Sequence, residues 1–176
     1  MNKESAAILV PTYRTGHEQL ANLAYLAACS HDDLVIYFGD NSESHEKHQY
    51  LRMLSSIYPN IRLILHSKNI GALFNIFQLL DASKSHNLLL FATDDDRVSL
   101  SFIQKSFEDL RADPDISRSA GSLLRIQSNG TVQNDTKDSI SNSSIDRFLE
   151  YFDPNSFNQI HYSAFRRKSR PDVNSV

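Results

Sequence analysis

The chain has 176 residues, of which 40% are hydrophobic and 22% charged, and its net charge is −3 at pH 7. This length and apolar content suit one domain with a substantial core. The slightly acidic balance gives no electrostatic reason to expect binding to nucleic acid. A single cysteine excludes an internal disulfide, and no apolar run is long enough for a secretory signal or a transmembrane helix. We therefore expect a cytoplasmic protein.

Four short, largely apolar runs predict buried strands in the first part of the chain. Runs of this kind, without regular polar alternation, are typical of strands that are covered on both faces of a parallel sheet. Pro11 is expected to end the first strand, and residues 12–14 are expected to form a loop. The predicted strands are Ala6–Val10, Leu34–Phe38, Ile61–Leu65 and Leu88–Ala92.

A helical pattern follows each predicted strand. Thr15-Gly16-His17-Glu18 is a capping-box pattern, Ser99 is expected to cap the fourth helix, and the second helix is expected over about His45–Tyr58, before Pro59. The stripes expected to be buried are Leu20, Leu23, Ala24 and Ala27 in the first helix, Leu51, Leu54 and Tyr58 in the second, Leu73, Ile76, Phe77 and Leu80 in the third, and Leu100, Ile103, Phe107 and Leu110 in the fourth.

The alternation of strands and helices predicts an α/β fold with a mostly parallel sheet and helices on both faces. The pattern changes after residue 112. A hairpin is expected from Ser119–Ile126 and Thr131–Val132 around Asn129-Gly130, then a helix, then a final strand at Gln159–Phe165. The apolar face expected for that helix consists of Ile145, Phe148, Leu149 and Phe152. We expect a single domain over 1–176, with a binding half at 1–112 and a mixed, partial acceptor-side half at 113–176.

Three adjacent acids, Asp94, Asp95 and Asp96, directly follow the fourth predicted strand. In open α/β sheets this edge is where ligands bind. Asp94 and Asp96 are expected to point the same way, and a shared Mg²⁺ or Mn²⁺ would hold two such carboxylates together. A solvated acidic turn that caps the next helix is the alternative.

The other three strand ends carry residues that suit a nucleoside diphosphate. Tyr13 can stack on a base, and Asp40 can accept a hydrogen bond from a base N–H. Gly71, at a helix start, leaves backbone N–H groups for a phosphate. Taken singly, these residues suit a packing aromatic, an Asx turn and a helix cap. Their expected meeting at one sheet edge favours a nucleotide site.

The segments VPTYR, YFGDNSES, HSKNIGALFNIFQLL and LLLFATDDD resemble, in order and spacing, the family 2 glycosyltransferases of the GT-A fold. The resemblance covers about Ile8–Leu110, and HYSAFRR matches more loosely. It implies metal-dependent transfer of a sugar, with inversion, from a nucleotide-diphosphate donor to an acceptor hydroxyl. The donor implied most often is a UDP-sugar. It also suggests a role in the synthesis of bacterial surface polysaccharide or glycoconjugates.

The resemblance also implies site residues. Asp94–Asp96 would be the DxD motif, with Asp95 near the ribose or sugar and Asp96 on the metal. The implied nucleotide-sugar-binding residues are Pro11, Thr12, Tyr13, Arg14, Asp40, Asn41, Asn69, Gly71, Asp94 and Asp95, and the implied metal ligands are Asp94 and Asp96.

An acceptor hydroxyl needs a carboxylate base, which this family supplies after the strand that HYSAFRR resembles. Asp172 is the only carboxylate in Lys168–Val176 and is the candidate base there, but the chain looks short at this end and we expect the family's base to be absent. Asp135, Asp138 and Glu150 remain open. If none of these residues serves as the base, the chain is a nucleotide-sugar-binding module without turnover. A sugar-nucleotidyltransferase is disfavoured, because the first strand end lacks a glycine-rich loop with a lysine.

Two further groups of side chains each have a functional and a bland interpretation. The basic run after the last strand suits a lipid-linked acceptor or a peripheral membrane contact, or a solvated strand exit. It consists of Arg166, Arg167, Lys168 and Arg170. His45 and His48 share a helix face, and a solvated face is favoured over a metal site because no partner acid or cysteine is evident.

Overall fold

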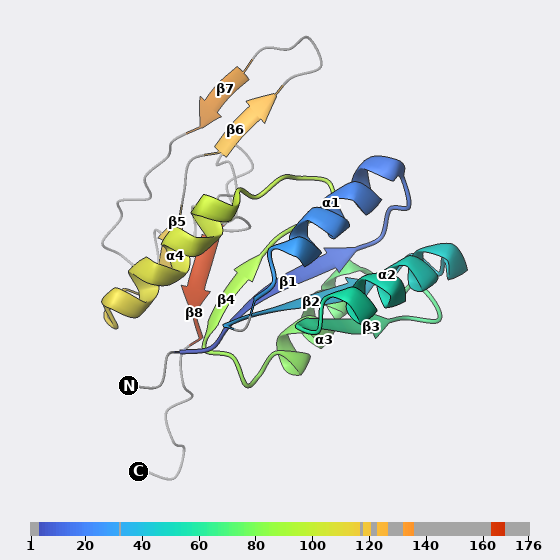
Figure 1. The fold of residues 1–176 in the computed structure, drawn as a ribbon, viewed down its shortest axis with the longest axis horizontal. Coiled ribbons are helices and arrows are strands. Elements are labelled where there is room, and N and C mark those ends of the chain that lie inside the picture. The colour runs from blue at the N-terminus through green and yellow to red at the C-terminus, as the bar shows by residue number, and fades with distance from the viewer. Residues whose placement is uncertain are drawn as a thin grey trace.

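The computed structural model describes residues 4–31, 33–116, 118–120, 123–126, 132–135 and 163–167 (Figure 1). In this part of the chain, six strands form one sheet in the order β3-β2-β1-β4-β8-β5. The four parallel strands are β1 (Ala6–Thr12), β2 (Leu34–Asp40), β3 (Ile61–Leu65) and β4 (Leu88–Phe91). Beyond β4 the sheet continues with β8 (Ser163–Arg166) and then β5 (Arg118–Ala120), and β8 is antiparallel to both β4 and β5.

The strand order reverses beside β1. The chain first builds outward through β2 and β3, then returns to place β4 on the other side of β1. Such a switch point opens a crevice at the carboxyl ends of the two strands that flank it. β1 is two residues longer than expected, since Pro11 pairs with Gly39, and Thr12 accepts the Asn41 N–H at 2.9 Å. Pro11 therefore does not end the strand, because the ladder continues through the next residue.

Helices cover both faces of the sheet, as expected. α1 (His17–Ala28), α2 (His45–Ile57) and α4 (Leu100–Ala112) pack on one face, and α3 (Ala72–Ala82) packs on the other (Figure 1). Right-handed crossovers explain this arrangement, because the change of direction after β3 sends the next helix to the opposite face. The α1, α2 and α4 face holds the larger apolar cluster, which includes the fully buried Ile8, Phe38 and Leu90.

The buried face of α3 differs from the expected one. Leu79 and Asn75 are buried, whereas Leu73 and Phe77 are 60% and 54% exposed. Asn75 lies inward because its Nδ2 donates to the carbonyl of Gly39 at 2.7 Å, and Leu79 packs in the same cluster as Leu9. The apolar spacing predicted the helix correctly but its buried face only in part, because Ile76 and Leu80 of the expected stripe are partly buried.

The expected helix ends are mostly confirmed. Ser44 caps α2 by accepting from the Lys47 N–H, and Ser99 caps α4 by accepting from the Phe102 N–H, both at 3.2 Å. At α1 the cap is Gly16, with no side-chain cap bond, so the expected capping box does not form. Among the described residues no helix is long and apolar enough to cross a bilayer.

The second half of the chain is only partly described. The strand expected at Ser119–Ile126 is divided, because β5 joins the large sheet while β6 (Leu123–Ile126) pairs with β7 (Val132–Asp135). The antiparallel β6–β7 pair confirms the predicted hairpin. Its turn, the helix expected at Ile145–Phe152 and the start of the last strand lie outside the described residues.

We predict that Gly39→Ala destabilises the fold. A methyl group there would lie 2.5 Å from Asn75 Oδ1 and 3.0 Å from Leu79 Cδ1, and both side chains are buried and cannot swing away. Overpacking of this kind lowers the free energy of unfolding by about 1–3 kcal/mol, which urea denaturation would measure. Gly16→Ala is the control, because its methyl group would meet only the end of Gln19. Equal effects of the two substitutions would contradict the prediction.

Candidate functional site

The carboxyl ends of β1, β2 and β4 meet around one buried lysine. The Nζ of Lys47 donates to Thr12 Oγ1 and to the Arg14 carbonyl, each at 2.6 Å. It also lies 3.1 Å from Asp40 Oδ1 and 3.7 Å from Asp94 Oδ2. The residues expected at three separate strand ends are therefore joined by a single ammonium group.

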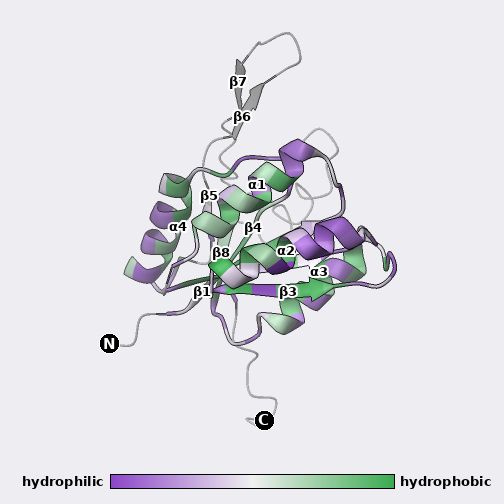
Figure 2. Cartoon of the chain, turned by 45° about the vertical axis from the view of Figure 1, so that its right-hand side comes forward, coloured by the Kyte–Doolittle hydropathy of each residue, from purple (hydrophilic) through white to green (hydrophobic). Residues whose placement is uncertain are grey.

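Lys47 is the main site residue that the sequence analysis missed. It lies in the first turn of α2, a strongly hydrophilic stretch (Figure 2), and is only 2% exposed. A cation at a helix amino terminus is disfavoured by the helix dipole, so the two carboxylates must offset that cost. Its spacing to Leu51 and Leu54 is that of a buried helix face, and this spacing is the signal that could have identified it.

Asp40 points inward. Its exposed fraction is 0%, and its Oδ2 accepts from the Ser42 hydroxyl at 2.8 Å. Its Oδ1 faces Lys47, and His48 Nε2 lies 3.0 Å from Oδ2 at ion-pair distance but without hydrogen-bond geometry. The expected contact between Asp40 and a nucleobase stays a prediction, and in this structure the carboxylate is already surrounded by protein groups.

Asp94 connects β4 to the loop after β1. Its Oδ2 accepts from the hydroxyl of Thr12 and from the backbone N–H of Tyr13, the latter at 3.2 Å. With 6% exposure it is nearly buried. The three expected aspartates therefore differ, because Asp94 fixes a loop while its neighbours face solvent to a greater extent.

The loops after β2 and β3 are fastened to each other. Asn41 donates from Nδ2 to Asn69 Oδ1 at 2.7 Å and accepts at Oδ1 from the Ile70 N–H at 2.8 Å. Glu43 has a left-handed backbone, with φ of 58°, and its carboxylate accepts the Asn69 N–H at 2.8 Å. The Gly71 N–H, expected to be open for a phosphate, donates to Asn69 Oδ1 at 2.8 Å.

Four polar or aromatic groups line the exposed side of this edge. The guanidinium of Arg14 lies 3.6 Å from Asp95, and these side chains are 66% and 43% exposed. Tyr13 is also exposed, as expected for a stacking platform. Asp96 accepts from the Thr93 hydroxyl at 3.1 Å, and Asn22 holds the backbone of this loop by donating to the Asp96 carbonyl at 2.6 Å.

The donor set suits a divalent cation held by few protein ligands. Within the described residues, no three histidine, cysteine or acidic side chains are placed so that they could hold a metal ion by themselves. Mg²⁺ and its relatives commonly take one or two carboxylates together with substrate phosphates. The exposed Asp95 and the half-buried Asp96 fit that pattern.

The residues expected at the acceptor side lie elsewhere or outside the described chain. Asp172, Asp138 and Glu150 are not described, and Asp135 belongs to β7 in the small sheet. Arg166 pairs with Leu88 at the start of β4, at the opposite edge from the aspartates.

The two described arginines of the basic run make bonds within the fold. Arg166 forms an ion pair with Glu4, and Arg167 donates to the Leu80 carbonyl at 3.1 Å. These bonds favour a structural role for both arginines.

The chain is similar to known proteins in structure but not detectably in sequence. No protein family profile and no curated protein match the sequence. PcManGT, a mannosyltransferase from Pyrobaculum calidifontis solved with GDP-Man and Mn²⁺, is 17% identical over 66% of this chain and 34% of its own, with a TM-score of 0.53. A 1–349 form of S. aureus TarS is 14% identical over 92% of this chain and 47% of its own, with a TM-score of 0.61.

This chain has a GT-A-like fold. That likeness confirms the fold class expected from the sequence, at an identity too low to carry more than the fold. The chain spans between a third and a half of the length of these two structures. A longer structure of S. aureus TarS matches over 60% of this chain and 19% of its own, with 14% identity and a TM-score of 0.50.

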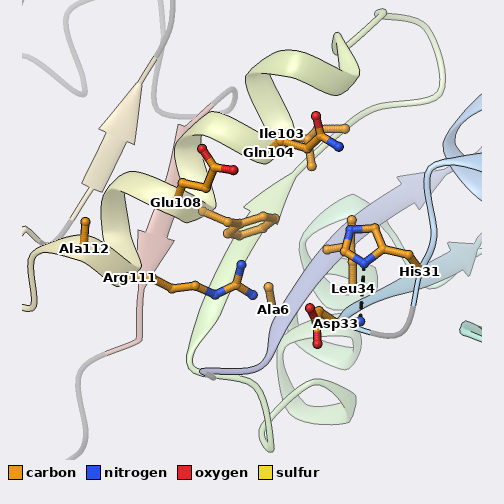
Figure 3. Close-up of a pocket in the computed structure, with 10 residues that line it drawn as sticks. Ala6, His31, Asp33, Leu34, Ile103, Gln104, Glu108, Arg111 and Ala112 are labelled. Atoms are coloured by element: carbon orange, nitrogen blue, oxygen red, sulfur yellow. Dashed lines mark hydrogen bonds between the residues drawn. The ribbon is translucent and has the colours of Figure 1, made fainter. Parts of the chain in front are cut away.

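A pocket of about 640 Å³ lies at the other edge of the sheet (Figure 3). It is lined by Ala6 and Leu34 at the amino ends of β1 and β2, and by Glu108 and Arg111 of α4. Arg111 is already engaged, since its Nη2 donates to the Glu4 carbonyl at 3.0 Å. This pocket is distinct from the aspartate edge and contains none of the expected donor-binding residues.

Proposed function

We propose that the chain is a glycosyltransferase that binds a nucleoside diphosphate-sugar at the carboxyl edge of β1, β2 and β4. One observation carries this proposal: the loops expected to hold the donor meet at the switch point of a GT-A-like sheet and are bonded to one another. The GDP-Man complex of PcManGT, which shares this fold, supports a nucleotide-sugar donor. The UDP-sugar remains the prediction from sequence resemblance.

A divalent cation, Mn²⁺ or Mg²⁺, belongs to this proposal. Because Asp94 Oδ2 is engaged by Thr12 and Tyr13, we assign the cation chiefly to Asp95 and Asp96 in place of the expected pair, Asp94 and Asp96. When bound, the cation supplies Lewis-acid stabilisation of the diphosphate leaving group. The Mn²⁺ in the PcManGT complex supports this choice.

The chain's own residues would bind and orient the donor. Tyr13 offers an exposed ring for stacking, and Arg14 offers a cation beside Asp95 that can pair with a phosphate once a ligand is present. Asn69 and Gly71 shape the loop at the start of α3. The buried contacts of Thr12 and Asn41 hold these groups in place, so the edge is organised before a ligand arrives.

The acceptor side of the proposal rests on sequence alone. We propose an acceptor hydroxyl on a glycan or lipid-linked glycan, attack with inversion, and Asp172 as base. A role in surface polysaccharide synthesis, on the cytoplasmic side of a membrane, belongs to the same proposal. The competing hypothesis is a nucleotide-sugar-binding module without turnover. Release of free sugar from the donor, or transfer of that sugar to an acceptor, would show that the chain is an enzyme.

The decisive test is a nucleotide panel. We expect thermal stabilisation of the full chain by at least one nucleoside diphosphate-sugar, increased by Mn²⁺, because a ligand that binds only the native state raises its stability. Differential scanning fluorimetry with UDP-, GDP-, CDP- and ADP-sugars would measure it, with EDTA as the metal control. No shift with any of them would count against a donor site at this edge.

A further inference from the structure

The buried contacts of Lys47 bear on which nucleotide the site accepts. We propose, on the basis of the proposed function, that Lys47 withholds Asp40 from the donor, so that the site does not select uridine through its ring N–H. This makes Lys47 a positioning residue that sets nucleotide selectivity through Asp40.

The ammonium group has no donor left for a ligand. Its three hydrogens face three oxygen atoms within 3.1 Å, those of Thr12, the Arg14 carbonyl and Asp40, and Asp94 Oδ2 lies at 3.7 Å. The ammonium group of Lys47 therefore occupies the Asp40 oxygen that would otherwise be open to a base N–H.

The second oxygen of Asp40 is enclosed by protein groups as well. The Ser42 hydroxyl donates to Oδ2 at 2.8 Å, His48 lies 3.0 Å from the same atom, and the residue has no exposed surface. A base N–H could bond to this carboxylate only if the Lys47 pair were broken inside the protein. Breaking a buried ion pair is costly, so the pair is expected to persist when a nucleotide binds.

The position of Lys47 in the helix indicates that its role lies in its contacts with the site and not in stabilising the helix. Helix α2 would gain nothing from a buried cation in its first turn, where the dipole favours acidic groups. The neighbouring Glu46 lies in the same turn and carries the negative charge that the helix dipole favours there. Lys47 is therefore explained by what it touches, namely the carboxylate expected to recognise the base.

UDP and CDP provide matched probes. At the ring nitrogen that faces such a carboxylate, uracil carries a hydrogen-bond donor and cytosine an acceptor, while the sugar and diphosphate are identical. An open Asp40 would favour UDP by roughly tenfold or more, because a charge-assisted bond forms with one base and lone pairs repel with the other. A withheld Asp40 would discriminate little.

The experiment measures the dissociation constants of UDP and CDP for the full chain by calorimetry, with Mn²⁺ present. We expect the two constants of the unaltered protein to lie within about threefold of each other. Lys47→Ser, which leaves room for water beside Asp40, should shift the ratio at least roughly tenfold toward UDP. Adding Asp40→Asn to that variant should remove the shift, and Lys84→Ser, at an exposed lysine beyond α3, should leave the ratio unchanged.

The outcomes separate this inference from the function on which it rests. A preference for UDP above about threefold in the unaltered protein overturns the inference and leaves the donor site intact. A folded Lys47→Ser variant with an unchanged ratio also overturns it. If Lys47→Ser does not fold, the ratio of the UDP and CDP dissociation constants in the unaltered protein tests the inference alone. Failure of both nucleotides and of every donor sugar to bind would instead overturn the proposed function, and this inference with it.

Discussion

Asp96→Ala should reduce Mn²⁺-dependent nucleotide binding by roughly a hundredfold or more, and Asp95→Ala should act in the same direction. These two carboxylates are the accessible ones of the three at the end of β4, whereas Asp94 is nearly buried and bonded to Thr12. Their removal leaves the diphosphate charge without its cation. Titration of UDP in the presence and absence of Mn²⁺, by calorimetry, would measure the loss.

The control for this result is an aspartate away from the site. Asp81→Ala, on the exposed surface near the end of α3, should bind metal and nucleotide as the unaltered protein does. Thermal unfolding without ligand should be little changed in Asp95→Ala, because this side chain makes one exposed ion pair. Unchanged metal dependence in Asp96→Ala would contradict both the enzyme and the binding-module hypothesis.

Lys47→Met should lower the free energy of unfolding by about 3–5 kcal/mol. The substitution keeps much of the side-chain volume but leaves Asp40 and Asp94 buried without their shared cation. It also removes the donors to Thr12 and the Arg14 carbonyl. Urea denaturation followed by circular dichroism would measure the change, and the slope m should stay constant if only stability is affected.

Two companion variants test the cause of that effect. Lys47→Met combined with Asp40→Asn should recover part of the loss, because an amide is far less costly to bury than an unpaired carboxylate. Lys84→Met should leave the unfolding midpoint unchanged, since Lys84 is exposed. A loss in Lys47→Met no greater than that in Lys84→Met would show that the buried contacts contribute nothing.

The sequence predicted the architecture well because strand ends and helix caps are encoded locally. The apolar run Leu88–Phe91 predicted the strand that the aspartates follow, and Ser99 predicted the start of the next helix. Such signals depend on neighbouring residues alone. They also placed the loops of β1 to β4 at one edge once the sheet was taken to be parallel.

Other features depend on contacts between distant residues, and these were missed. The orientation of α3 is set by Asn75 bonding to Gly39, 36 residues earlier, which outweighs the apolar stripe through Leu73 and Phe77. Lys47 was overlooked for a similar reason, because a lysine predicts an exposed position unless its partners are known. Its partners Thr12 and Asp94 lie 35 and 47 positions away in the chain.

The pairing of β1 with β4 has a consequence for biosynthesis. The Thr12–Asp94 contact spans 82 residues, so a chain leaving the ribosome cannot assemble the aspartate edge until β4 has been made. Loop closure over such a distance is slow compared with helix formation, so α1 and α2 can form while their partner strand is still absent. During that interval the edge of β1 that pairs with β4 has no partner strand, and such an unpaired edge is open to pairing with another chain.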